Sequence, residues 1–233
     1  MIRIFAKWQD RVILSSEDEH HLVHVLRVVP GESIELLIEG QVFLGRVVKI
    51  KPLQIEKLSP LTLSHELPFR ITLIYPVIKG EKMDWVVQKA AELGIAELIP
   101  CMSERSVVRW DLKDIEKKFF RFQRIIQEAT LQSKREAMMK MNRYLKLSEA
   151  LTLEFTEKWV ASEVHLQTFL PPNLRFRKDT SISLLIGPEG GLSAEELSLA
   201  IKRGYQPFSL GPSILRSETA VVTALSMLRE RGF

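Results

Sequence analysis

The segment with the clearest chemical potential is Gly187-Pro188-Glu189-Gly190-Gly191, which follows an apolar run at residues 182–186. Its three glycines allow backbone conformations and close approaches that a side chain would block. In parallel α/β sheets, ligands bind at the carboxyl ends of strands, where such a loop would lie. The segment lacks the Lys-Ser/Thr pair of a P-loop and the spacing of the dinucleotide fingerprint, and Glu189 would repel phosphates. It therefore predicts a site for an uncharged or cationic ligand, such as a sulfonium; the alternative is a turn that binds nothing.

A second glycine-containing loop, at residues 210–216, follows the last predicted strand. Two such loops leaving neighbouring strand ends would enclose a flat ligand such as adenine between backbone groups. Ser217 is placed to cap the final helix. Arg216 lies just before that helix, where an anion or a carbonyl oxygen is favourably bound. The alternative for Arg216 is a surface salt bridge with Glu218 or a neighbour.

Three histidines, His20, His21 and His24, raise the question of a metal site, since two of them lie one helical turn apart. The spacing lacks a catalytic Glu and a third ligand, and His65 is the only other candidate nearby. We expect no metal. Histidines that are satisfied internally, or that face RNA beside Arg27, are the favoured interpretation.

The charge distribution points to a polyanionic partner. The chain of 233 residues has a formal net charge of +4, yet residues 109–146 alone hold eleven Lys/Arg against five Asp/Glu. A local basic excess is what a phosphate backbone requires. The alternative is a solvated helix face.

The remaining composition limits the cellular setting. A single cysteine, Cys101, excludes an internal disulfide framework and fits a reducing compartment; we interpret it as a buried structural thiol. The N-terminus is too short and interrupted for a signal peptide, and no apolar run approaches the roughly 18 residues that span a bilayer. The sequence therefore predicts a cytoplasmic protein without membrane association.

Two regions differ in their pattern. Residues 3–6, 33–38 and 42–50 read as short strands, and a capping box at residues 16–19 opens a helix that continues over 20–27. This pattern predicts a small β-barrel.

Beyond a proline-containing linker at residues 59–68, apolar strands alternate with helices, which implies a parallel sheet covered on both faces. Gly94 is placed to end the first of these helices in the left-handed conformation, and Ser193 begins a capping box. The expected strands are residues 71–75, 95–100, 158–162, 182–186 and 206–210, and the expected helices are residues 83–93 and 114–132 and those that start near 194 and 218.

Five stretches of the chain resemble one known family. Residues 186–196 (IGPEGGLSAEE) and 210–220 (LGPSILRSETA) are similar to the cofactor loops of SPOUT-class RNA methyltransferases. Residues 82–105, 128–135 (EATLQSKR) and 20–31 (HHLVHVLRVVPG) narrow the resemblance to the enzymes that methylate N3 of a uridine in bacterial 16S ribosomal RNA. The resemblance runs from near Arg3 to the last helix.

The resemblance implies a fold and a cofactor. Residues 1–67 would form a PUA-like RNA-binding β-barrel, and residues 68–233 a parallel-sheet α/β domain with a trefoil knot, a topology that physical rules would not predict. The enzyme would act as a homodimer on 16S ribosomal RNA or the small ribosomal subunit, with S-adenosyl-L-methionine as cofactor. The implied cofactor-binding residues are Ala161, Ser162, Glu163, Ile186, Gly187, Pro188, Glu189, Gly190, Gly191, Leu210, Gly211, Ile214, Leu215 and Ala220.

Candidate reacting and RNA-binding groups follow. Arg216 is the expected catalytic donor to a uracil carbonyl, and Glu189 or Glu163 the candidate general base. The chain departs from the family pattern at Lys134, where members commonly have Gly, and at residues 138–141, where they tend to carry a Pro. The expected RNA-binding residues are Arg3, Arg27, Arg105, Arg109, Arg124 and Arg135.

Overall fold

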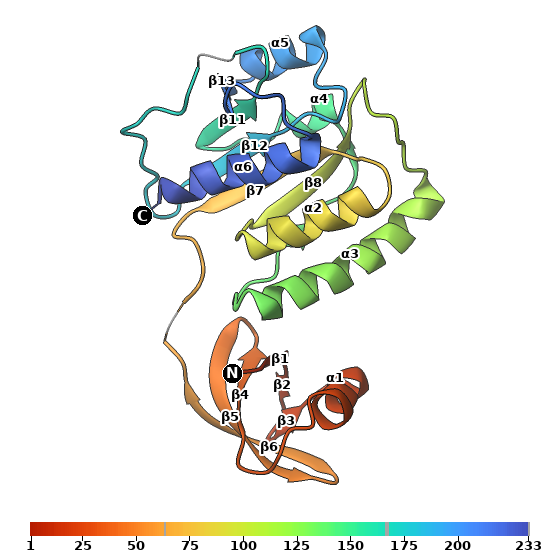
Figure 1. The fold of residues 1–233 in the computed structure, drawn as a ribbon, viewed down its shortest axis with the longest axis vertical. Helices are drawn as coiled ribbons and strands as arrows, with labels where there is room; N and C mark the ends of the chain where they lie inside the picture. Colours follow the sequence, from red (N-terminus) through yellow and green to blue (C-terminus); the bar gives the residue numbers. More distant parts are fainter. Residues whose placement is uncertain (63, 166–167, 233) are drawn as a thin grey trace. The chain divides into compact units, whose positions relative to one another are not determined.

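The computed structural model describes residues 1–62, 64–165 and 168–232 and divides into two compact units (Figure 1). Unit 1 comprises Met1–Glu66 together with Thr130–Ala137. Unit 2 comprises Leu67–Ala129 and the chain from Met138 onward. Because the sequence pattern of residues 114–132 is one continuous helix, it gave no indication that the end of this helix groups with the first unit.

Unit 1 is built on a four-stranded sheet in the order β1-β4-β5-β6. β1 runs parallel to β4, and the other pairs are antiparallel. Ile4, Leu22, Ile34, Leu36 and Val47 form the centre of its core. The elements of the unit are β1 (Arg3–Phe5), the hairpin β2 (Lys7–Trp8) and β3 (Val12–Ile13), α1 (Ser16–His20), the π-helical turn η1 (His21–Val25), β4 (Ser33–Ile38), β5 (Gln41–Ile50) and β6 (Leu53–Pro60).

Three expectations for unit 1 were wrong in detail. The helix N-cap is Ser15, not Ser16, because the Ser15 hydroxyl is the one within reach of the Asp18 amide, at 3.1 Å. The helix predicted to continue over 20–27 changes to the π-helical η1, in which Leu22 is buried and joins the core. The end of β6 takes Ser59 and Pro60 out of the predicted linker.

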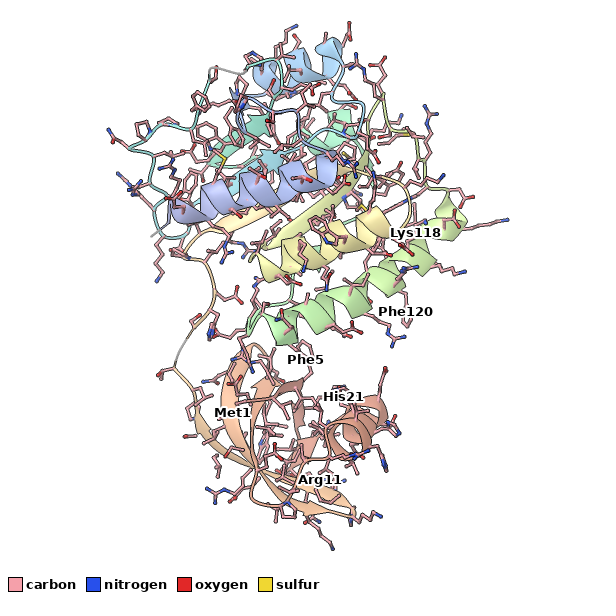
Figure 2. All side chains as sticks on the ribbon, in the orientation of Figure 1. Met1, Phe5, Arg11, His21, Lys118 and Phe120 are labelled. Carbon is pink, nitrogen blue, oxygen red and sulfur yellow. The ribbon has the colours of Figure 1, made fainter. Side chains whose placement is uncertain are left out.

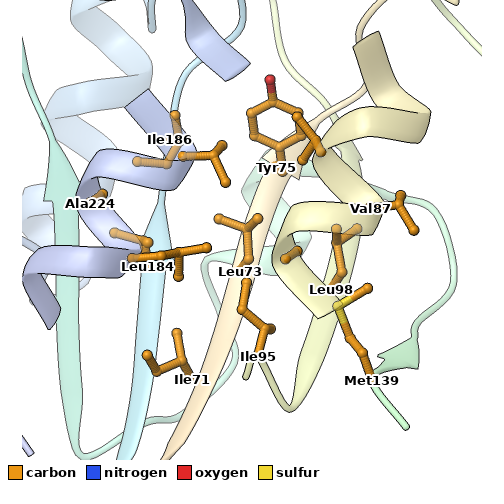
Figure 3. Packing of buried hydrophobic residues seen from close by; sticks show 14 of the residues in the cluster. Ile71, Leu73, Tyr75, Val87, Ile95, Leu98, Met139, Leu184, Ile186 and Ala224 are labelled. Carbon is orange, nitrogen blue, oxygen red and sulfur yellow. The ribbon is translucent and has the colours of Figure 1, made fainter. Parts of the chain in front are cut away.

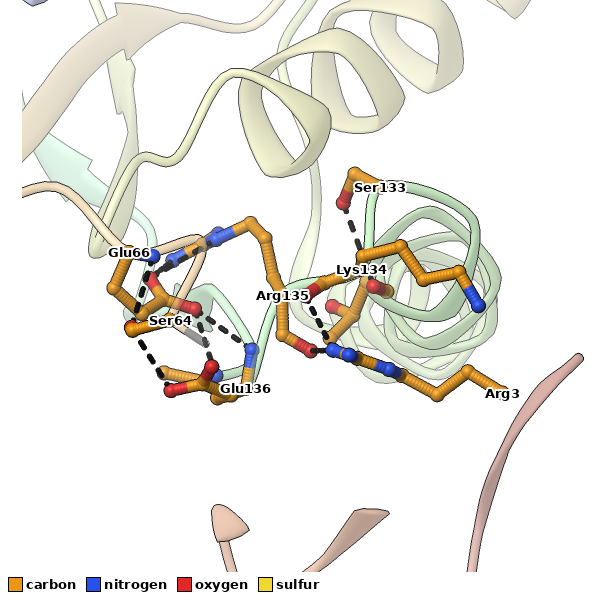
Figure 4. Close-up of polar contacts among 9 residues, drawn as sticks. Arg3, Ser64, Glu66, Ser133, Lys134, Arg135 and Glu136 are labelled. Atoms are coloured by element: carbon orange, nitrogen blue, oxygen red, sulfur yellow. Dashed lines mark hydrogen bonds and ion pairs between the residues drawn. The ribbon is translucent and has the colours of Figure 1, made fainter. Parts of the chain in front are cut away.

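A buried cluster of polar side chains ties Thr130–Ala137 to the rest of unit 1 (Figure 4). The Arg3 guanidinium pairs with Glu35 at 2.7 Å and also donates to the backbone carbonyls of Lys134 and Arg135. Arg3 is 8% exposed. A guanidinium buried in this way is satisfied entirely within the protein.

The second half of this cluster centres on Glu66. Its carboxylate accepts from the Arg135 guanidinium at 2.7 Å and from the backbone amides of Glu136 and Ala137 at 2.8 and 2.9 Å. Burial opposes ionisation of this carboxyl, but the hydrogen bonds from Arg135 and the two amides outweigh it and hold the pKa of Glu66 below its ordinary value.

Lys134, one of the departures from the family pattern, lies in a backbone conformation that favours glycine. Its backbone φ is +62°, in the left-handed region where glycine is unstrained. The side chain compensates in part, because its ammonium donates to Glu35 at 3.1 Å and to the Met1 carbonyl. The lysine thus keeps the backbone conformation that a glycine would adopt freely.

Unit 2 contains a parallel sheet in the strand order β10-β8-β7-β12-β11-β13, with β9 also paired to β8. The predicted α/β fold with a parallel sheet is confirmed. The strands are β7 (Arg70–Pro76), β8 (Glu97–Met102), β9 (Lys140–Met141), β10 (Leu145–Lys146), β11 (Glu157–Ala161), β12 (Ser181–Leu185) and β13 (Gln206–Phe208).

Helices cover both faces of this sheet, as predicted (Figure 1). Successive strand residues point to opposite faces, so Leu73 and Leu184 join one core (Figure 3) while Ile74 and Leu185 join the other. The helices that contribute to the first core are α2 (Glu81–Glu92), α3 (Leu112–Gln132) and α6 (Ser217–Glu230), and those that contribute to the second are α4 (Leu147–Ala150) and α5 (Ala194–Lys202).

Two predictions for unit 2 that rest on local sequence patterns are confirmed. Gly94 has φ of +89° after α2, and Ser193 caps α5 through a capping box with Glu196. Ser217 was wrong as a helix cap, because Arg216 is the N-cap and Ser217 is the first helical residue. The strand predicted at 95–100 begins and ends later, as β8. The trefoil knot stays a prediction, because the connection from β11 to β12 includes residues 166–167, which lie outside the described residues.

The low pKa of Glu66 predicts an acid-sensitive unit 1. The contribution of this carboxylate is fully present above the unfolded-state value of 4.5 and is lost as the pH falls through the lower folded-state value. We expect Glu66→Gln to lower the free energy of unfolding by about 1–3 kcal/mol at pH 7, and to reduce the loss of stability between pH 5 and 3. Urea denaturation across this range is the measurement. Glu56→Gln, at an exposed carboxylate on β6 of the same unit, is the control, and an identical pH slope for Glu66→Gln and wild type would contradict the assignment.

Candidate functional site

Three loops at the carboxyl ends of β11, β12 and β13 line one pocket in unit 2. The three strands end nearly level, because Val160 pairs with both Leu185 and Pro207 in the sheet register. The pocket residues are Ala161, Ser162, Glu163, Val164, Ile186, Gly187, Pro188, Glu189, Gly191, Leu192, Leu197, Ser209, Leu210, Gly211, Ser213, Ile214, Leu215, Ser217 and Ala220.

The structure brings together almost the whole set of residues expected from the sequence. Of the expected cofactor-binding residues, only Gly190 does not line the pocket. Sequence reasoning missed six others, of which Leu197 was detectable from the helical spacing of α5, whereas the serines carried no periodic signal. The missed residues are Val164, Leu192, Leu197, Ser209, Ser213 and Ser217.

Backbone geometry explains why glycine occupies two positions of the loop after β12, at residues 187–191. A Cβ on Gly187 would lie 3.0 Å from the Leu192 backbone nitrogen, so the loop would have to shift. Gly191 has φ of +68° and closes a turn in which its amide donates to the Pro188 carbonyl at 2.9 Å. Gly190 has neither constraint: a Cβ there would meet its nearest neighbour, in Arg105, at an ordinary 3.4 Å.

A buried hydrogen-bond chain holds the start of this loop. The Ser217 hydroxyl donates to the Gly187 carbonyl at 2.6 Å, and the Tyr75 hydroxyl lies 2.8 Å from the same Ser217 oxygen. Burial and the nearby carboxylates of Glu189 and Glu218 raise the pKa of Tyr75 above its ordinary value, although its bond to Ser217 opposes the shift. Tyr75 therefore stays protonated, and the chain of donors runs from Tyr75 through Ser217 to Gly187.

The candidate reacting groups differ in their surroundings. Glu189 is paired with the Lys82 ammonium at 3.5 Å. Glu163 is exposed and also lines the pocket, and beside it the Ser162 hydroxyl lies 2.8 Å from His165 Nδ1. Arg216 does not line the pocket; it is exposed at the N-cap of α6, between two residues that do.

Two of the six arginines expected to bind RNA are buried. Arg3 and Arg135, both under 10% exposed, are held in unit 1 by Glu35 and Glu66 respectively. Their guanidinium groups serve the internal ion pairs described above. We therefore no longer assign phosphate contacts to them.

The other four arginines are exposed. Arg27, in unit 1, follows η1 with φ of +53°. In unit 2, Arg105 donates to the Gly190 carbonyl at 3.1 Å, and Arg109 lines a shallow groove that also contains Lys146. Arg124 lies on α3, the helix from which Lys118 and the exposed Phe120 also project (Figure 2).

The three N-terminal histidines and Cys101 lie outside the pocket. Among the described residues, no group of three or more His, Cys, Asp or Glu side chains could hold a metal ion. The ring centroids of His20 and His24 lie 4.7 Å apart with the rings tilted by 37°, and His21 is exposed on the surface (Figure 2). Cys101 is fully buried, and burial raises the pKa of its thiol above the ordinary value, as expected for a structural residue. Within the described part of the chain, no helix is long and apolar enough to cross a membrane.

Comparison with known proteins gives the family. A family model described as an RNA methyltransferase domain matches residues 65–229, and one described as an RNA methyltransferase PUA domain matches residues 14–58. Ribosomal RNA small subunit methyltransferase E of Bacillus subtilis is 30% identical over 228 residues, which cover 92% of this chain and 88% of that protein. This chain belongs to the same family.

Solved structures of members of this methyltransferase family agree in fold over the full length. A ribosomal RNA small subunit methyltransferase E from Neisseria gonorrhoeae bound to S-adenosyl methionine is 28% identical, with a TM-score of 0.84 over 100% of this chain and 98% of that one. A protein from Legionella pneumophila, described as a methyltransferase with the cofactor SAM bound, is 32% identical, with a TM-score of 0.87 over 99% of this chain and 98% of that one. The predicted SPOUT-type fold with a PUA-like domain is thereby confirmed.

The glycine geometry leads to a paired test. Gly191→Ala forces a side chain into the left-handed region, so we expect it to lower the free energy of unfolding by about 1–2 kcal/mol. Gly190→Ala, one residue earlier, has space and an ordinary backbone, and we expect a change within about 0.5 kcal/mol. Urea denaturation of both variants measures the difference. Equal losses in the two variants would show that the loop conformation is not the one described.

Proposed function

We propose that this protein transfers a methyl group from S-adenosylmethionine to N3 of a uridine in the 16S ribosomal RNA of the small subunit. The observation that carries the proposal is the three-loop pocket, formed by the same residues that resemble the cofactor loops of SPOUT methyltransferases. The functions of the relatives support the substrate class, since they are ribosomal RNA small subunit methyltransferases. The choice of uracil N3 rests on the family resemblance.

The chemistry of the pocket fits such a cofactor. Gly187 and Gly191 allow the backbone conformation of the loop that lines the pocket, because a Cβ on Gly187 would meet the Leu192 nitrogen and Gly191 has a positive φ. Ile186, Leu197 and Leu210 supply apolar walls suited to an adenine ring. Glu163 adds negative charge, which suits a cationic sulfonium and disfavours a phosphate.

S-adenosylmethionine would supply a methyl group bonded to a sulfonium sulfur, which would leave as a neutral thioether when N3 takes the methyl group. The protein would therefore contribute mainly positioning and electrostatics. N3 of uracil must lose its proton as it is alkylated, which places negative charge on the two carbonyl oxygens. Arg216, at the rim of the pocket, is the proposed donor to one of them. Glu163 is a better candidate than Glu189 for the proton acceptor, because Glu189 is already paired with Lys82.

RNA binding is assigned to the exposed cations. Arg27, Arg105, Arg109 and Arg124 are proposed to contact phosphates. The target base lies in structured RNA, so its extrusion from the stack would accompany binding. A homodimer acting in the cytoplasm, without a metal, completes the proposal.

Methyl transfer can be tested directly with purified components. We expect the protein to transfer label from S-adenosyl[methyl-³H]methionine to 16S ribosomal RNA, supplied either free or in the small subunit. Digestion to nucleosides should then place the label in N3-methyluridine. Label in another nucleoside would move the target, and cofactor binding without any transfer would support a non-catalytic RNA-binding protein.

The role of Arg216 gives a second test. Arg216→Ala removes the proposed carbonyl donor, so we expect kcat to fall by about a hundredfold, with the Kd for S-adenosylmethionine unchanged. Arg203→Ala, at an exposed arginine following α5, is the control and should leave both quantities unaltered. A higher cofactor Kd with unchanged kcat would instead make Arg216 a cofactor ligand.

A further inference from the structure

Lys82, in the first turn of α2, stands between two carboxylates from distant parts of unit 2. Its ammonium lies 3.5 Å from Glu189 Oε1 and 3.6 Å from Glu218 Oε1. The side chains of Lys82, Glu189 and Glu218 are 44%, 35% and 15% exposed. One cation therefore serves two acids, of which Glu218 is the more buried.

The two acids lie on two different segments that border the pocket. Glu189 is in the loop after β12, and Glu218 is in the first turn of α6, immediately after the pocket residue Ser217. The Oε2 atom of Glu218 is buried and has no hydrogen-bond partner among the described residues. Without Lys82, the loop acid would face a partly buried negative charge near the N-terminus of α6.

Lys82 is one of three anchors on the same short loop. Gly187 is held through Ser217 and Tyr75, and the Gly190 carbonyl is held by Arg105. Neither Lys82 nor Arg105 lines the pocket. The loop is thus held at Gly187, Glu189 and Gly190 by three separate groups.

The three anchors differ in what they contribute. The Tyr75–Ser217 chain is buried and is part of the packed core, so its loss would disturb folding. The Lys82 pairs are partly exposed, and ion pairs of this kind contribute little to global stability. The effect of Lys82 should therefore fall on the population of the ordered loop rather than on the fold.

We propose that Lys82 is a positioning residue for cofactor binding. By neutralising Glu189 and Glu218 together, it holds residues 187–191 against the N-terminus of α6 in the conformation that binds the ligand. This inference rests on the proposed function, because the ligand used to detect it is S-adenosylmethionine. Lys82 also occupies the carboxylate of Glu189, which leaves proton acceptance to another group.

Isothermal titration of S-adenosylmethionine into the full-length protein tests the proposal without relying on turnover. If Lys82→Met reduces the binding-competent loop to a tenth of the population, the apparent Kd rises about tenfold. We expect the melting temperature to change by less than about 2 °C, because the ion pairs are partly exposed. Lys82→Arg should restore affinity close to that of wild type, since it keeps the charge. Lys79→Met, at the exposed lysine that precedes α2, is the matched control and should bind as wild type does.

A double variant separates charge repulsion from loss of the side chain. In Lys82→Met/Glu189→Gln the two carboxylates no longer repel each other, so we expect the Kd to recover part of the tenfold loss. Unchanged affinity in Lys82→Met, or equal affinity in Lys79→Met and Lys82→Met, would overturn the proposal. Failure of the wild type itself to bind S-adenosylmethionine would instead overturn the proposed function.

Discussion

The pocket depends on the parallel pairing of β11, β12 and β13. In a parallel sheet all carboxyl ends meet at one edge, so loops that are separate in the sequence converge there. The register makes the convergence close, because Val160 is level with Leu185 on one side and Pro207 on the other. An antiparallel neighbour would send one of the three loops to the opposite edge and leave the pocket without a wall.

Stability and site geometry are supplied by different parts of unit 2. The two apolar cores fix the sheet, and buried side chains such as Leu73 and Ile74 serve opposite faces of the same strand. Polar contacts then fix the conformation of the pocket loop at residues 187–191. They come from the Tyr75–Ser217 chain, Arg105 and Lys82. Because the Lys82 and Arg105 contacts fall on the loop and not on the sheet, loop conformation can respond to charge while the fold stays intact.

Sequence reasoning succeeded where short-range physics decides the outcome. The capping box at Ser193, the left-handed Gly94 and the apolar runs that became β7 and β12 are all local features. The pocket itself was predictable because glycine-rich loops after buried strands have a fixed place in a parallel sheet.

The failures at Arg3, Arg135 and Lys82 share one cause, which is that the deciding partner lies far away in the chain. Arg3 and Arg135 looked like surface cations until the fold placed Glu35 and Glu66 beside them. Lys82 showed no special role in the sequence, because Glu189 and Glu218 follow it by more than a hundred residues.

The most direct test of the proposed methyl transfer is the nucleoside composition of 16S ribosomal RNA from cells with and without this gene. Mass spectrometry of the digested RNA should show that N3-methyluridine disappears when the gene is deleted and returns when the wild-type gene is restored. Persistence of N3-methyluridine in the deletion strain, with loss of a different methylated nucleoside, would contradict the assigned target. Loss of no methylated nucleoside would contradict methyl transfer to this RNA altogether.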